Sequence, residues 1–143
     1  MSAPVPATAV TALLRARSAL DEAAAATEPT QRYATAHVAA LRATAALLAV
    51  RTHPSPRRGQ RNAWSLLARV APEMAEWATF FAAGAGKRAA AEAGLSRLVS
   101  ARDADDLVRD VERYLLVVQR SLGASVEQTL SAWPDPADPA DVA

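Results

Sequence analysis

Apolar residues recur at steps of three and four positions along most of the 143-residue chain, the spacing of one face of an α-helix. This spacing predicts a first helix over about residues 7–26 and a second from Pro29 to about Arg51, because proline is tolerated in the first turn of a helix. The apolar positions of the first helix are Val10, Leu13, Leu14 and Leu20. The buried stripe predicted for the second is Tyr33, His37, Ala40, Leu41, Thr44, Leu47 and Leu48.

Two further helical segments follow in the second half of the chain. The third begins near Asn62, and Pro72 predicts a kink in it or two short helices. Its stripe is Trp64, Leu67, Val70, Met74, Trp77 and Phe81. The last long helix opens at Ser100-Ala-Arg-Asp103, which approximates a capping box, and we expect Gly123 to close it. Its buried stripe is Leu107, Val108, Val111, Tyr114, Leu115, Val118 and Leu122.

Small residues separate these last two segments. They predict a short helix over about residues 87–93, capped by Gly94. Within the last helix, Asp105 and Arg109 are spaced to form an ion pair on its outer face. Four main amphipathic segments joined by short loops predict an all-α fold, a four- to five-helix up-and-down bundle.

Composition supports this fold class and removes several kinds of chemistry. The chain contains 37 Ala and 15 Arg, both strong helix formers, but only 5% aromatic residues, which excludes an all-β fold. It contains no Cys, so a disulfide framework, a thiolate nucleophile and a Cys-ligated metal are excluded. Two histidines are too few for a multi-histidine metal cage, and we expect neither a metal nor a cofactor.

The apolar runs of the chain are short. A membrane-spanning helix needs about 18 apolar residues, and Arg42 interrupts the longest run, between Val38 and Val50. The opening Met-Ser-Ala-Pro-Val-Pro has no basic residue ahead of an apolar stretch, unlike a secretory signal. We therefore expect a soluble cytoplasmic protein without membrane contact.

The net charge of +1 is a sum of two unlike parts. Residues 1–123 carry 16 basic and 11 acidic side chains, a net charge of +5, whereas residues 124–143 carry four acidic and no basic ones. The segment from Trp133 to Ala143 has a proline every two or three residues, which blocks both helix and sheet. We predict a helical bundle over 1–123 and a disordered, Pro- and Asp-rich acidic tail over 124–143.

One pair of residues has the spacing of a candidate catalytic site, Arg32 and His37. An imidazole can take a proton from a ribose 2′-OH, and a guanidinium can donate two hydrogen bonds to the phosphate of the transition state. On an ideal helix a step of five turns about 140°, which places the two side chains on different faces. A partner subunit across a two-fold axis would bring one chain's Arg32 to the other's His37. The alternative is that His37, on the apolar stripe, is a hydrogen-bonded core residue.

A second candidate is the loop that Pro54, Pro56 and Gly59 predict between the second and third helices. Arginines in a loop can hold phosphates without reading sequence, and Trp64 beyond it could stack on a base. The alternatives are a solvated loop and a Trp64 that begins the apolar stripe of the core. The RNA-binding residues proposed here are Arg51, His53, Arg57, Arg58 and Arg61.

The chain also resembles an actinobacterial family of HEPN-domain proteins. The resemblance covers about residues 30–122 and includes blocks 62–73 and 104–110. Its most specific part is Trp77-Ala-Thr-Phe-Phe-Ala-Ala-Gly-Ala-Gly-Lys-Arg-Ala-Ala-Ala-Glu-Ala-Gly94. The resemblance implies a four- or five-helix bundle in a superfamily that includes metal-independent ribonucleases acting as dimers.

The motif of those ribonucleases is an Arg, usually followed by a polar residue, and a His after four to six intervening positions. Arg32 and His37 match this spacing, whereas Tyr33 departs from the usual polar residue. Other HEPN domains are non-catalytic binding modules, so two hypotheses remain. The first is an RNA-binding homodimer that cleaves RNA with His37 as general base and Arg32 stabilising the phosphate. The second is a non-enzymatic helical module that docks another protein or a nucleotide.

Overall fold

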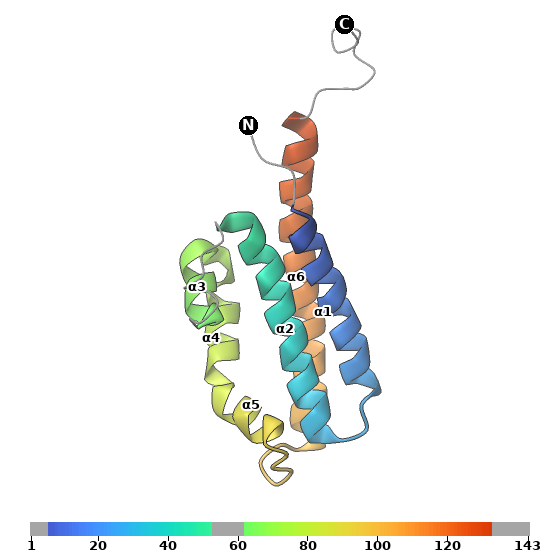
Figure 1. The fold of residues 1–143 in the computed structure, drawn as a ribbon. Coiled ribbons are helices and arrows are strands. Elements are labelled where there is room, and N and C mark those ends of the chain that lie inside the picture. Colours follow the sequence, from blue (N-terminus) through green and yellow to red (C-terminus); the bar gives the residue numbers. More distant parts are fainter. Residues whose placement is uncertain (1–5, 53–61, 133–143) are drawn as a thin grey trace, which may run out of the picture.

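A computed structural model describes residues 6–52 and 62–132, with the side chains of 6–52 and 62–123. All regular structure in these ranges is helical, which confirms the predicted all-α bundle. The elements, drawn in Figure 1, are α1 (Ala7–Ala25), α2 (Pro29–Arg51), α3 (Ala63–Val70), the 3₁₀ turn η2 (Pro72–Met74), α4 (Ala75–Ala83), α5 (Ala85–Glu92) and α6 (Ala101–Ala132).

Helix α2 is the centre of the bundle. The long helices α1, α2 and α6 run side by side, and α3 and α4 lie along the other flank of α2 (Figure 1). The short helix α5 crosses one end of the bundle and packs against α2 before the chain turns into α6. As a result α2 contacts α1, α3, α5 and α6, and most of its length is enclosed by other helices.

The predicted punctuation of the chain is confirmed where it lies within the described residues. The side chain of Asn62 accepts a hydrogen bond of 2.9 Å from the backbone N–H of Trp64 and caps α3. Pro72 opens the 3₁₀ turn that leads directly into α4, so the third segment is split as predicted. Ser100 and Asp103 form a reciprocal capping box, with both bonds at 3.0 Å.

The buried face of α6 is the predicted one, since its whole predicted stripe is buried. The prediction for α1 is partly wrong. Val10 and Leu14 are 51% and 67% exposed, while the buried residues are small. Alanines on α1 face alanines on α2, and two helices with such faces can approach closely, so larger side chains are turned outward. The buried residues of α1 are Ala9, Ala16, Ala19, Leu20 and Ala23.

Two predictions for the last helix are also wrong. Gly123 does not close it, because α6 continues to Ala132 and so crosses the boundary predicted after residue 123. Among the described glycines only Gly94 has a positive φ, at 71°, and a glycine that keeps a helical conformation is tolerated at a cost of about 1 kcal/mol. Asp105 does not pair with Arg109, which lies near Asp106 instead, because Asp105 faces α2. The tail over 133–143 lies outside the described residues.

By length and composition, α2 is apolar enough to cross a membrane, so the prediction that Arg42 rules this out was too strict. Among the helices that the structure describes, α2 alone is long and apolar enough by this measure. Half of its most apolar stretch is buried inside the bundle. The core helix of a soluble protein meets the same criterion.

Candidate site around His37

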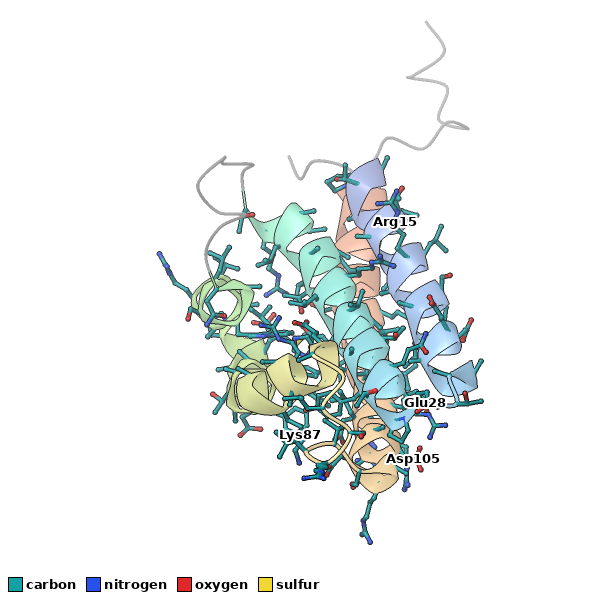
Figure 2. The ribbon with its side chains drawn as sticks, turned by 60° about the horizontal axis from the view of Figure 1, so that its bottom comes forward. Arg15, Glu28, Lys87 and Asp105 are labelled. Carbon is teal, nitrogen blue, oxygen red and sulfur yellow. The ribbon has the colours of Figure 1, made fainter. Side chains whose placement is uncertain are left out.

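Arg32 lies in the first turn of α2 and is tied to its surroundings on two sides. Its Nε and one terminal nitrogen donate hydrogen bonds of 3.0 and 2.7 Å to the carbonyl oxygen of Ala26, just beyond α1. Its other terminal nitrogen forms an ion pair with Asp105 at the start of α6. Figure 2 shows Asp105 at this end of the bundle, close to the beginning of α2. The guanidinium therefore joins three helices.

His37 lies one turn further along α2 and is turned into the core, with only 4% of its surface exposed. Its ring meets the rings of Trp64 and Phe81 edge to face, at centroid distances of 5.6 and 6.2 Å. Trp64 is itself buried and stacked on Phe81, which confirms the core interpretation of Trp64. The polar partners of Arg32 are Ala26 and Asp105, whereas the ring of His37 packs against Trp64 and Phe81, so within one chain the two side chains face different surroundings.

The environment of His37 favours its neutral form. Burial, and then the positive charge of Arg88, lower the pKa of His37 from 6.5 to about 4. The imidazole is therefore uncharged at neutral pH and can donate one hydrogen bond and accept another. Its Nε2 is buried and has no hydrogen-bond partner among the described residues. The predicted burial of His37 is confirmed, but the expected hydroxyl or carbonyl partner is not present at Nε2.

His37 forms part of the wall of a pocket of about 290 Å³ at the end of the bundle that α5 crosses. The turn between α4 and α5 approaches α2 closely here, since a Cβ at Gly84 would lie 3.2 Å from the hydroxyl oxygen of Tyr33. Aromatic and aliphatic side chains make up most of the wall. The lining residues are Tyr33, His37, Phe80, Phe81, Ala83, Gly84, Lys87 and Leu107.

Two residues with polar side chains line this pocket besides His37, namely Tyr33 and Lys87. The ammonium of Lys87 is 3.1 Å from a carboxylate oxygen of Asp103, which lies in the first turn of α6. Figure 2 shows Lys87 on α5 at the same end of the molecule as Asp105. Burial, and then the negative charge of Asp103, raise the pKa of Tyr33, so its hydroxyl stays protonated at neutral pH and can donate a hydrogen bond.

Of the residues predicted to bind RNA, Arg51 is the one that the structure describes. One of its terminal nitrogens forms an ion pair with Glu73, and the other donates a hydrogen bond of 2.9 Å to the hydroxyl of Ser121. These contacts join the end of α2 to η2 and α6. The other four residues, His53, Arg57, Arg58 and Arg61, lie outside the described residues.

The family of the chain follows from a match that spans this site. The sequence profile of the SAV_6107-like HEPN family matches residues 23–119, from the end of α1 to within α6. The chain belongs to this HEPN family. No curated protein and no solved structure matches the chain significantly. The matched range contains every residue that lines the pocket of this HEPN domain, including Leu107 of α6.

The sequence of the HEPN domain predicted His37 as a candidate catalytic residue, with a core position as the alternative, and it did not predict the pocket beside it. Lys87 and Gly84 carried a signal, because they belong to the block of small residues that is the most specific part of the family resemblance. Tyr33 carried another, as the departure from the usual ribonuclease motif. Within residues 6–52 and 62–132, His, Asp and Glu side chains form no group of three that could hold a metal ion.

Proposed function

We propose that this HEPN domain is a non-catalytic binding module, in which His37 is a recognition group in the pocket rather than the general base of RNA cleavage. The observation that supports this most directly is the separation of the two motif residues. Arg32 has its guanidinium committed to Ala26 and Asp105, and His37 is turned into the aromatic core. A catalytic pair would have to meet at one phosphate.

The protonation state of His37 supports the same proposal. Metal-independent RNA cleavage needs a base that takes the 2′-OH proton and an acid that protonates the leaving oxygen. With a pKa of about 4, the imidazole of His37 is neutral at pH 7 and is a weak base, since catalytic groups work best with pKa values near the ambient pH. The resemblance described above implies that HEPN domains include non-catalytic binding modules, so membership of a HEPN family does not require cleavage.

A cleavage assay tests this proposal. Purified full-length protein is incubated with single-stranded RNA and a chelator, beside the variants His37→Ala, Arg32→Ala and Arg42→Ala. Arg42 is an exposed arginine on the same helix, so its removal controls for charge and for traces of a contaminating nuclease. We expect no cleavage by the wild type above the level of the three variants. Cleavage that disappears in His37→Ala and Arg32→Ala but persists in Arg42→Ala would overturn the proposal.

RNA binding without cleavage is a second candidate, favoured by the net charge of +5 over residues 1–123. Binding through phosphate contacts weakens steeply as salt rises, by roughly one power of the salt concentration per contact. We expect this dependence for the wild type and a smaller slope for a variant in which Arg57, Arg58 and Arg61 are replaced by Gln. A flat salt response, or an unchanged slope in the variant, would exclude this candidate.

A homodimer belongs to the catalytic alternative, because only a second copy could supply Arg32 to His37. Sedimentation analysis of the purified chain at several concentrations measures this directly. A monomer at concentrations where RNA is cleaved would exclude the two-fold arrangement of Arg32 and His37.

A further inference from the structure

Two buried side-chain nitrogens have no hydrogen-bond partner within the described part of the chain, Nε2 of His37 and Nε of Arg88. The Arg88 nitrogen still has an ion-pair partner in Glu92, at 3.9 Å, so His37 is the residue left without a polar contact at that atom. The two residues are close enough for the charge of Arg88 to act on His37. Buried polar groups in folded proteins are almost always paired, so the unpaired Nε2 marks His37 as an exception. His37 also lines the pocket, so a molecule bound there lies against its imidazole ring.

The wall of the pocket shows which chemistry that molecule must have. Phe80, Phe81 and Leu107 present flat and branched apolar surface, which favours a ring. Lys87 and Tyr33 present an ammonium and a hydroxyl, and a carboxylate accepts hydrogen bonds from both. Lys87 has three N–H groups, so its contact with Asp103 leaves donors for a ligand.

Size and charge narrow the class further. The pocket volume of about 290 Å³ lies at the lower end of the range for ligand sites, which suits a single ring with a short acidic side chain rather than a nucleotide. Among the residues that line the pocket, Lys87 is the charged one, and its carboxylate partner is Asp103 on α6. Arg88, whose charge acts on His37, is paired with Glu92. A single ammonium in the wall matches a single carboxylate better than a dianionic phosphate.

We propose that this pocket binds a small aromatic carboxylic acid, with its carboxylate at Lys87 and Tyr33, its ring against Phe81, and a polar ring substituent hydrogen-bonded to His37. This inference rests on the proposed function, because it gives the non-catalytic pocket its ligand class. A neutral imidazole can either donate to a ring hydroxyl or accept from it, so a phenolic hydroxyl is the substituent that fits best.

Titration of the full-length protein with 4-hydroxyphenylacetate, phenylacetate and the neutral 4-hydroxyphenylacetamide tests the proposal. Protein labelled with ¹⁵N in its two histidines gives one pair of imidazole nitrogen signals for each histidine, and the pair of His53 serves as the internal control. We expect 4-hydroxyphenylacetate to shift the His37 signal and leave that of His53 unchanged, with phenylacetate and the amide binding more weakly. The proposal fails if no acid moves the His37 signal at millimolar concentration, or if the acid and its amide bind equally.

Three variants assign the contacts. Lys87→Gln should weaken the acid about fivefold, the upper end for an exposed ion pair, and leave the amide unaffected. Arg97→Gln, which removes a charge from the exposed turn after α5, should change neither. His37→Phe keeps an aromatic ring in the core, and it should abolish the preference for 4-hydroxyphenylacetate over phenylacetate. Equal effects of Lys87→Gln and Arg97→Gln would mean that general charge attraction, not the pocket, holds the acid.

Failure of this inference is distinguishable from failure of the proposed function. Cleavage of RNA that depends on His37 would overturn the binding-module proposal, whether or not the protein binds the acids. An inert protein that binds none of the acids would overturn the ligand class alone.

Discussion

The folding stability of this HEPN domain should fall as the pH is lowered through the range where an unfolded histidine takes up a proton. The pKa of His37 is 6.5 without the fold and about 4 within it, because burial and Arg88 disfavour the charged imidazole. Between these values the unfolded state binds more protons than the folded state, so stability decreases as pH decreases. The contribution is fully present above pH 6.5 and is lost by pH 4.

The size of the effect follows from the two pKa values. Each pH unit between them costs about 1.4 kcal/mol per proton, so about 2 kcal/mol is lost at pH 5 and about 3 kcal/mol by pH 4. Only 4% of the surface of His37 is exposed, so solvent screening reduces this loss of stability little. A loss of 2 kcal/mol is a substantial part of the stability of a domain of this size.

Urea denaturation between pH 8 and pH 4.5, followed by circular dichroism, measures this loss. The variant His37→Phe provides the control, since phenylalanine does not titrate and its ring can meet Trp64 and Phe81 as the imidazole does. The difference between the two curves removes the contribution of the carboxylates, which titrate in both proteins. We expect similar stabilities at pH 8 and an advantage of about 2 kcal/mol for His37→Phe at pH 5. Parallel curves, or a His37 signal that titrates near pH 6.5, would refute the buried neutral histidine.

Two pairs of substitutions test the packing of the bundle. Thr44 donates to the carbonyl of Ala40 at 2.8 Å, so in its 2.6 Å contact with Tyr114 the phenol is the donor. We expect Thr44→Val to lower the free energy of unfolding by about 2 kcal/mol and Tyr114→Phe to lower it by about 1 kcal/mol. The double variant should lose less than the sum of the two, and additive losses in denaturant melts would contradict this pairing. Gly94→Ala should lower the free energy of unfolding by about 1 kcal/mol, because φ at Gly94 is 71°. Gly123→Ala lies within α6 and should raise the free energy of unfolding by up to about 1 kcal/mol. If both variants shifted the melting temperature in the same direction, this reasoning would be refuted.

The helices that sequence periodicity predicted best are those whose buried face consists of large residues. Every member of the predicted α6 stripe is buried, because leucines, valines and Tyr114 on one face have a single favourable orientation. In α1 the larger residues Val10 and Leu14 are exposed. A prediction that assigns burial to the most hydrophobic residues misses a helix face made of alanines, which is buried by close contact between helices. The high alanine content of this chain makes that error more frequent.

Predictions about pairs of residues failed where the partner came from another helix. Asp105 has Arg109 four positions away, but it pairs with Arg32, which is 73 residues distant in the chain. Local spacing does not reveal such a partner. The same limit applies to the pocket, whose wall combines residues of α2, α4, α5 and α6. The sequence supplied Tyr33 and His37 as neighbours on one helical face, but not the turn at Gly84 that brings Lys87 to them.

His37 is the residue at which local rules and the fold disagree most clearly, and that disagreement supports a functional role. Its neighbours Trp64 and Phe81 would accept an apolar ring equally well, whereas the imidazole leaves Nε2 unpaired and loses its charge on burial. A residue that costs stability at acidic pH and adds none over phenylalanine at neutral pH is unfavourable for folding alone. Because His37 lines a pocket together with Tyr33 and Lys87, an acid bound there would contact its imidazole ring. Ligand binding stabilises the folded state, so the domain should melt at a higher temperature with 4-hydroxyphenylacetate than without it, and this gain should be smaller in His37→Phe.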